Sequence, residues 1–122
     1  MVNVPIHVVD KIERHHKPII NQIRHKIGQP IHVSQNSGYR SKDWELSHGR
    51  SGTSEHTFTG LGAVDYTCAN MELLLEELRA SDYKRICYYP EQKFIHCDHK
   101  GDRYHEFEVD EDGKWQYKGE RK

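Results

Sequence analysis

Three side chains of the kinds that bind transition metals come from different parts of the chain: His56, Asp65 and His96. Zinc accepts two imidazoles and one carboxylate as ligands, and a catalytic zinc keeps its fourth position open to water or substrate. A structural zinc would use four protein ligands and would usually include paired cysteines. The pattern therefore predicts a single hydrolytic zinc site held by these three residues.

Residues 94–98 (FIHCD) are typical of a strand, and alternation along a strand sorts their side chains between two faces. His96 and Asp98 fall on one face, and Cys97 falls on the other and points away from the site. Asp98 could orient the site as a partner of the ligand, or could take part in proton transfer. Taken alone, this segment is equally compatible with an ordinary polar strand.

The surroundings of Asp65 and of Arg40 also suggest chemistry at such a site. Asp65 lies in the apolar run at residues 62–66, where an acid is costly to bury unless it is paired or binds a metal. Arg40 follows a Ser-Gly-Tyr turn, where a guanidinium could bind a carboxylate through two hydrogen bonds or stabilise oxyanion charge. The plainer alternatives are a turn-capping Asp65, a surface ion pair at Arg40 and a loop histidine at His56.

The elements that must position these residues follow from hydrophobic patterning. Residues 8–27 have helical spacing, and Pro18 within them predicts two short helices or a kink, with Gly28 as the stop. A long loop is predicted for residues 42–60 and a helix for 70–79. Strands are predicted at residues 31–33, 62–66, 85–89, 93–98, 104–109 and 114–117, the last two joined by an Asp-Gly hairpin turn. This order predicts an α+β fold with a central antiparallel sheet and flanking helices.

Composition narrows the class of protein. The 122 residues suggest one domain, residues 1–122, and the net charge of -1 gives no electrostatic footprint for nucleic acid or an anionic membrane. No apolar run follows Met1, so we expect neither a secretory signal nor a membrane span, and synthesis in the cytoplasm. The three cysteines show no CxxC spacing, which predicts reduced thiols. We expect a monomer without nucleic-acid or membrane partners.

Three motifs in order carry a resemblance to a known family. They are Ser37-Gly38-Tyr39-Arg40-Ser41, the stretch from Ser54-Glu55-His56 to Gly62-Ala63-Val64-Asp65, and Phe94-Ile95-His96-Cys97-Asp98. The combination resembles the zinc D-alanyl-D-alanine carboxypeptidases and L-alanyl-D-glutamate endopeptidases, which share a fold with hedgehog signalling domains. It covers about residues 27–101 and looks most like the small single-domain members found in bacteriophages and as bacterial cell-wall enzymes.

The resemblance implies a fold and a set of roles. It implies the small α+β fold of the hedgehog and D-Ala-D-Ala peptidase type. His56, Asp65 and His96 would bind one zinc ion. Arg40 would lie near the substrate carbonyl or carboxylate, and Ser54 would support the loop that bears the first histidine.

The chain departs from the family pattern in two places. His56 and Asp65 stand nine positions apart, two more than is usual in the family, so the insertion either bulges outward or disturbs the site. Many members also carry an acid three residues before the last histidine, where this chain has Lys93. Asp98 is therefore the expected acid/base. The further candidates for that role are Glu91 and His99.

The function that the resemblance implies is zinc-dependent hydrolysis of a peptide bond in peptidoglycan stem peptides. Such an enzyme would act at the cell wall after release by a phage, or would be carried on a virion. In that reaction Asp98 would take up and deliver the proton, and Arg40 would help to stabilise negative charge. The alternatives are an inactive metal-binding, cell-wall-binding or structural virion module of the same fold, and a metal-free protein with incidental histidines.

Overall fold

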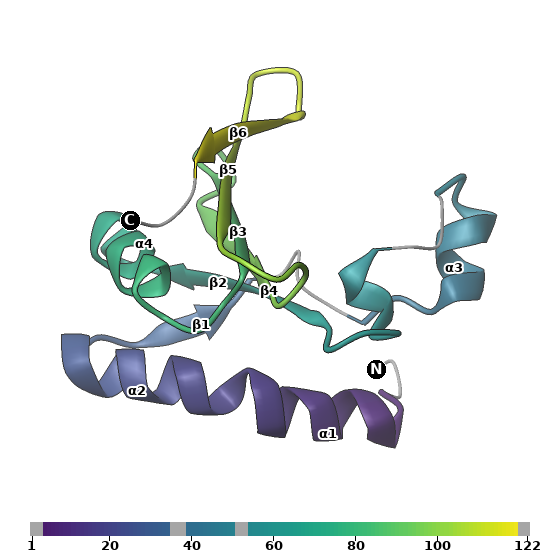
Figure 1. Cartoon of the computed structure of the whole chain (residues 1–122), viewed down its shortest axis with the longest axis horizontal. Helices are drawn as coiled ribbons and strands as arrows, with labels where there is room; N and C mark the ends of the chain where they lie inside the picture. The colour runs from purple at the N-terminus through teal and green to yellow at the C-terminus, as the bar shows by residue number, and fades with distance from the viewer. Residues whose placement is uncertain (1–3, 35–38, 51–53, 120–122) are drawn as a thin grey trace.

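The computed structural model describes residues 4–34, 39–50 and 54–119, so Ser37 and Gly38 of the arginine motif lie outside the described residues. Helices and strands form one α+β arrangement, which confirms the predicted fold class (Figure 1). The elements in chain order are α1 Ile6–His15, α2 Lys17–Ile27, β1 Ile31–Val33, α3 Lys42–Ser47, the 3₁₀ helix η1 Glu55–Thr57, β2 Ala63–Cys68, α4 Met71–Arg79, β3 Arg85–Tyr89, β4 Phe94–Asp98, β5 His105–Val109 and β6 Trp115–Gly119.

Helices α1 and α2 lie end to end beside the sheet (Figure 1). The break falls at His16, and Pro18 occupies the first turn of α2, where its missing N–H costs nothing. Gly28 ends α2 at a φ of 66°, a left-handed conformation that glycine adopts without strain. Of the two predicted alternatives, two short helices or a kink, the structure shows two helices, and the predicted stop at Gly28 is confirmed. None of the helices in the described ranges is long and apolar enough to cross a bilayer.

The six strands form one sheet in the order β1-β2-β4-β3-β5-β6. Every neighbouring pair is antiparallel except β3 and β5, which run parallel, so the sheet is mixed rather than wholly antiparallel as predicted. The reason is that β4 is already paired on both edges, with β2 and β3. The next strand joins the free edge of β3, and after two reversals of the chain it runs in the same direction as β3.

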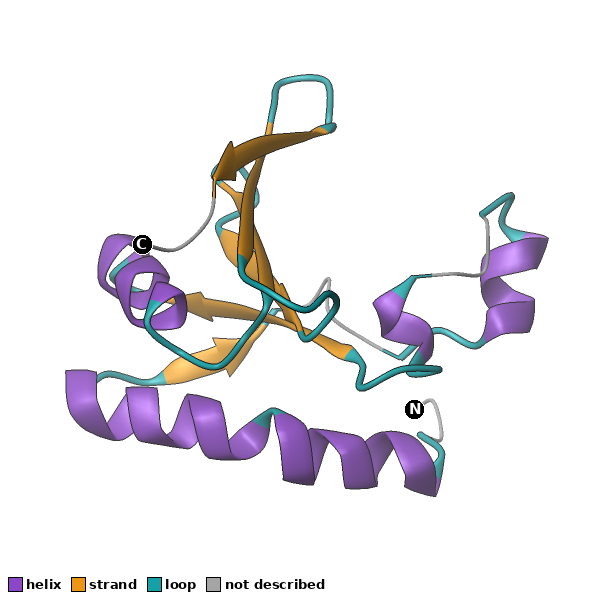
Figure 2. Cartoon of the chain, in the orientation of Figure 1, coloured by secondary structure: helices purple, strands orange, loops and turns teal. Residues whose placement is uncertain are grey.

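The two faces of the sheet differ in chemistry. One face packs against α1, α2 and α4 around a hydrophobic core, to which the strands contribute Tyr66, Ile86 and Ile95. Cys97 also lies in this core, as strand alternation predicted. The opposite face carries Asp65 and His96, and the β5–β6 hairpin rises beyond it, away from α1 and α2 (Figure 2).

The segment predicted to be one long loop, residues 42–60, contains two short helices, and this prediction is wrong for α3 and η1. Each helix begins at a serine. The Oγ of Ser41 accepts a hydrogen bond from the backbone N–H of Trp44 at 3.0 Å, and the Oγ of Ser54 accepts one from His56 at 3.2 Å. Serine caps of this kind satisfy donors that the first helical turn leaves unpaired.

A buried polar network joins the helices to the sheet. His16 is fully buried, and its Nε2 donates to the carbonyl oxygen of Leu61 at 2.9 Å. Its Nδ1 therefore accepts from the hydroxyl of Tyr83 at 2.8 Å, and that hydroxyl accepts from Tyr66 at 2.7 Å. Burial lowers the pKa of His16 from 6.5 to about 4, so the imidazole is neutral in the folded protein at neutral pH.

The contribution of His16 to stability should therefore fall in mild acid. Between pH 6.5 and about 4 the unfolded chain protonates His16 while the folded chain does not, so the unfolded state gains relative stability as the pH drops. The pKa difference corresponds to at most about 3 kcal/mol. Urea unfolding of wild type and His16→Gln at about pH 7 and about pH 5 measures it, and the variant should lose less stability than wild type.

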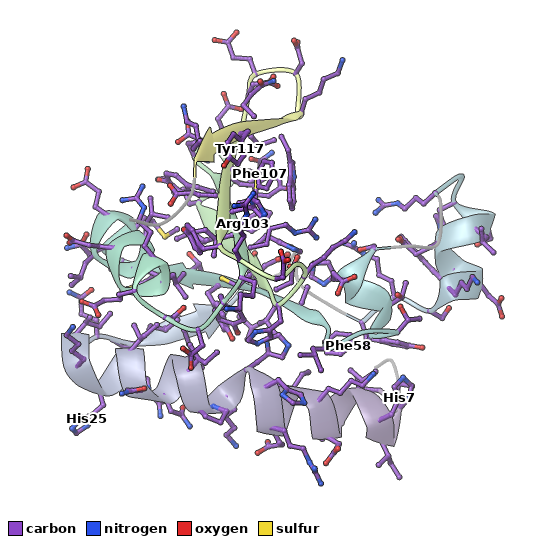
Figure 3. The ribbon with its side chains drawn as sticks, in the orientation of Figure 1. His7, His25, Phe58, Arg103, Phe107 and Tyr117 are labelled. Atoms are coloured by element: carbon purple, nitrogen blue, oxygen red, sulfur yellow. The ribbon has the colours of Figure 1, made fainter. Side chains whose placement is uncertain are left out.

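The matched control for this measurement is His25→Gln. His25 is exposed in α2 and projects away from the sheet (Figure 3). This variant should lose as much stability on acidification as wild type. An equal pH dependence in His16→Gln and wild type would contradict the assignment of the effect to His16.

Candidate metal centre

Three separate elements bring the candidate ligands together. Asp65 of β2 and His96 of β4 are directly paired across the two antiparallel strands. Residues opposite each other in such a pair project from the same face of the sheet. His56 comes from η1, which Ser54 caps, and the N–H of Arg40 donates to the carbonyl oxygen of His56 at 2.9 Å. Ser54 thus supports the loop of the first histidine, as the resemblance implied.

The three side chains form a compact and buried cluster. Their ligand atoms all lie within 4.8 Å of one another. The Oδ1 of Asp65 lies 3.3 Å from the Nε2 of His56 and 3.0 Å from the Nδ1 of His96. The exposed fraction is 4% for His56, 3% for Asp65 and 6% for His96. The structure therefore places the three predicted ligands at one point.

The cluster fits a zinc ion in donor chemistry and in spacing. Two imidazole nitrogens and a carboxylate oxygen are ligands that zinc prefers. Tetrahedral zinc with bonds of about 2.0–2.1 Å separates its ligand atoms by roughly 3.3 Å. The two separations from Asp65, 3.3 Å and 3.0 Å, are close to that value. The described residues thus offer three ligands, and the pocket next to them leaves room for a fourth.

The electrostatics of the cluster favour a bound cation. Burial by itself would raise the pKa of Asp65 and lower that of His96. Hydrogen bonds from His56 and His96 outweigh burial and lower the pKa of Asp65 to about 2. Hydrogen bonds to Asp65 and Asp98 raise the pKa of His96 above 6.5. The carboxylate is therefore ionised at neutral pH, and a metal must compete with a proton for His96.

Asp98 lies behind His96 and not in the pocket. Its Oδ2 accepts from the Nε2 of His96 at 2.7 Å, and Arg85 donates to the same carboxylate through Nε and Nη2, at 2.9 Å and 2.6 Å from Oδ2. The backbone N–H of Lys100 donates to Oδ1 at 2.9 Å. Asp98 is fully buried and its oxygens are engaged. This geometry favours the orienting role over proton transfer.

A pocket of about 360 Å³ opens beside the cluster. Arg40 contributes to its wall, where the sequence predicted a substrate arginine. Its guanidinium carbon lies 5.9 Å from the centre of the Trp44 ring, which Arg50 contacts at 5.2 Å. The residues that line the pocket are Arg40, Arg50, Ser54, His56, Asp65, Tyr89, Gln92, Phe94, His96 and Trp115.

The further acid/base candidates lie elsewhere. Glu91 is exposed in the turn between β3 and β4 and lines a different pocket, together with Glu108 and Glu111. His99 lies on the helix side, where its Nε2 donates to the carbonyl oxygen of His15 at 2.8 Å. Neither is among the described residues that line the pocket of the metal cluster.

The loop between His56 and Asp65, which is two residues longer than expected, is tied down rather than bulged outward. Lys11 of α1 donates to the carbonyl oxygens of Phe58 and Gly60 at 2.8 Å and 2.7 Å. The Nε2 of His16 donates a hydrogen bond to the carbonyl oxygen of Leu61 in the same loop. Figure 3 shows Phe58 near the α1 end of the helical layer. The longer loop therefore packs against α1 while the ligands still converge.

Sequence reasoning missed several residues that support the site. Arg85 was missed because the predicted strand bounds, 85–89 and 93–98, would set it opposite Cys97, whereas the observed four-residue turn at 90–93 sets it opposite Asp98. Lys11 and Trp115 gave no signal, since their contacts depend on how α1 and the last hairpin pack. Arg50 lies in the predicted loop, residues 42–60, whose path the sequence does not specify.

Loss of any one ligand should abolish stoichiometric zinc. We expect His56→Ala, Asp65→Ala and His96→Ala each to lose the ion while retaining the wild-type circular dichroism spectrum, because two ligands bind zinc poorly. His32→Ala, an exposed histidine of β1, serves as the control and should keep the ion. Elemental analysis after expression with zinc measures this. Zinc-free wild type, or three variants that all keep zinc, would show the assignment to be wrong.

Gly62 should be critical for the loop that joins the ligands. It has a φ of +89°, and a Cβ there would lie 2.1 Å from the ring of Phe58. Gly113 has a φ of +79° but open space around it, so Gly113→Ala introduces backbone strain without a steric clash. Overpacking costs about 1–3 kcal/mol, so Gly62→Ala should be less stable than Gly113→Ala by that amount. Equal midpoints in urea unfolding would contradict this packing.

A comparison of the sequence with known proteins and protein families agrees with a metal site at these residues. Searches of curated proteins and of solved structures each returned no match. A family model described as Peptidase M15 matches residues 6–98, a span that includes all three candidate ligands, Arg40 and Asp98. The family is one of zinc-dependent metallopeptidases, and the mixed six-stranded sheet with its helices is compatible with the fold of that family. The chain therefore belongs to the peptidase M15 family.

Proposed function

We propose that the chain is a zinc peptidase that hydrolyses a peptide bond in peptidoglycan stem peptides, as a carboxypeptidase or an endopeptidase. The observation that carries the proposal is the convergence of His56, Asp65 and His96 at one wall of a pocket, in a chain of the peptidase M15 family. One zinc ion held there would polarise the scissile carbonyl and lower the pKa of bound water toward about 7.

The cationic wall of the pocket supports a peptide substrate. Arg40 and Arg50 both line the pocket and both lie against Trp44, which limits how far their guanidinium groups move. Guanidinium groups bind carboxylates through paired hydrogen bonds and stabilise developing oxyanions. We assign to Arg40 the binding of a substrate carboxylate or of the negative charge that develops at the scissile carbonyl.

Aromatic residues of the pocket lining contribute hydrogen bonding and shape. Tyr89 and Phe94 stack with ring centres 4.2 Å apart, and Trp115 donates from Nε1 to the hydroxyl of Tyr89 at 2.8 Å. Burial raises the pKa of Tyr89, so its hydroxyl keeps its proton and can donate it as a hydrogen bond to substrate. In this proposal Tyr89 orients the peptide, and the aromatic rings exclude water from one side.

Asp98 acts on the reaction through His96 in this proposal. A carboxylate that accepts from the far nitrogen of a ligating histidine fixes the tautomer and the ring orientation. The 2.7 Å contact between Asp98 and the Nε2 of His96 leaves the Nδ1 facing Asp65 and the metal cluster. Asp98 is then a positioning residue, and its removal should weaken metal binding together with turnover.

We propose that the substrate is reached at the bacterial cell wall, by a monomer that a phage releases or carries on its virion. The support is the resemblance of the motifs to small single-domain phage and cell-wall enzymes. The near-neutral charge of the chain agrees with a peptide substrate rather than nucleic acid.

One observation favours the second candidate function, a metal-bearing module that binds the wall without cutting it. Among the described residues that line the pocket, Asp65 is the only carboxylate, and Asp98 is enclosed behind His96. A peptidase normally needs a group that accepts a proton from water. Incubation of the zinc-loaded protein with purified peptidoglycan, followed by mass spectrometry of released peptides, separates the two functions.

Arg40→Ala should retain full zinc content but lower peptidoglycan cleavage by about 10²-fold, the size of effect seen when one stabilising donor is lost. Arg40→Lys keeps the charge but not the planar fork, and should recover part of the activity. Lys42→Ala, two residues further on and outside the pocket lining, is the matched control and should behave as wild type.

The results of the peptidoglycan digestion and of the Arg40 variants distinguish the two candidate functions and test the role of Arg40. Released peptides of defined mass identify the bond cleaved and support the peptidase function. Wild type that binds zinc and sediments with purified walls but releases no peptide would overturn the peptidase proposal in favour of the binding module. Full activity in Arg40→Ala would remove Arg40 from the mechanism.

A further inference from the structure

The last hairpin of the chain contributes to the metal centre although it lies outside the family match. Strands β5 and β6 follow residue 98, where the match to the Peptidase M15 model ends. Even so, Trp115 at the start of β6 lines the same pocket as the three candidate ligands. The hairpin rises from the parallel pairing of β5 with β3 and carries Phe107 and Tyr117 on its strands (Figure 3).

Trp115 holds its position through contacts on several sides. Its ring centre lies 5.3 Å from that of His96 in an edge-on arrangement and 5.3 Å from that of Phe107. Its Nε1 donates to the hydroxyl of Tyr89 at 2.8 Å. The hydrogen bond and the ring packing restrict the indole, which lies beside the His96 ring.

Arg85 joins Trp115 to the other support of the ligand. Its guanidinium carbon lies 5.0 Å from the centre of the Trp115 ring, within cation–π range. The same guanidinium makes the paired hydrogen bonds to Asp98, which accepts from the Nε2 of His96. The four side chains form a closed ring of contacts in the order His96, Trp115, Arg85, Asp98 and back to His96.

We propose that Trp115 and Arg85 are positioning residues of the metal centre, which hold the imidazole of His96 at the angle that zinc binding requires. Asp98 fixes the ring from its Nε2 edge and Trp115 packs against it from the side. Arg85 keeps both supports in place. The hairpin beyond residue 98 is then part of the site and not an appendage. This inference rests on the metal site of the proposed function and not on the reaction.

The test compares Trp115→Ala with Tyr117→Ala. Tyr117 lies two residues along the same strand, is 55% exposed and contacts Phe107 and His105 but does not line the pocket. Two readouts are needed. Zinc affinity is measured by competition with a chromophoric chelator, and the ¹⁵N signals of the His96 ring, assigned with a His96→Gln variant, report its tautomer and surroundings in the metal-free protein.

Trp115→Ala should weaken zinc binding by about tenfold or more, the range found when the support of a metal ligand is removed. It should also shift the His96 ring signals. Tyr117→Ala should match wild type in both readouts, and Trp115→Phe, which keeps a ring but not the hydrogen bond to Tyr89, should fall between. Arg85→Gln should weaken zinc binding as Trp115→Ala does.

Two results would overturn the inference: wild-type zinc affinity and ring signals in Trp115→Ala, or equal losses in Trp115→Ala and Tyr117→Ala, which would mean general damage to the hairpin. If wild type takes up no zinc, the proposed function fails, and the His96 ring signals alone then decide the role of Trp115. Zinc binding with no peptide release removes the peptidase function and leaves this inference intact.

Discussion

One carboxylate oxygen organises the centre of this molecule. The Oδ1 of Asp65 lies 3.3 Å from one imidazole and 3.0 Å from another, and all three groups are buried. An ionised carboxylate in such surroundings is stable only when it is paired or bound to a metal. Asp65 has a fixed place in β2. The 3₁₀ helix η1 must therefore bring His56 to this carboxylate, and β4 must place His96 opposite it.

The sheet accommodates this polar cluster because its two faces carry different kinds of side chain. Its helix-covered face buries apolar side chains, and strand alternation leaves the other face for polar groups. The same pairing of β2 with β4 that completes the core sets Asp65 opposite His96. Stability and site geometry are therefore linked, since the strands cannot slip by one residue without exchanging the two faces.

The helical layer reaches the site through the loop between the first two ligands. Lys11 and His16 each hold carbonyl groups of that loop, and Phe58 fills the space that Gly62 leaves open. These contacts explain how a longer connection than the family usually has still delivers His56 to the cluster. They also place the neutral, buried imidazole of His16 at the helix–sheet interface. Protonation of His16 therefore affects the stability of the fold and does not involve the metal ligands directly.

Several features were determined by the sequence alone because they depend on local periodicity. Alternation in residues 94–98 sets His96 against Cys97, Pro18 divides the first helical segment, and Gly28 ends it. The short helices near Ser41 and Ser54 were missed, since capping by a single serine is a weak signal in a polar segment.

Other features were decided only by the tertiary structure. Strand alternation gives the face of a side chain but not its neighbours on adjacent strands. For that reason the sequence allowed Asp98 two roles, and only the contacts with Arg85 and His96 favour one of them. The parallel placement of β5 depends on which sheet edge is still free once β4 is paired on both sides. The approach of Trp115 to His96 follows from that placement, because a distant hairpin meets a ligand only through the packing of the whole sheet.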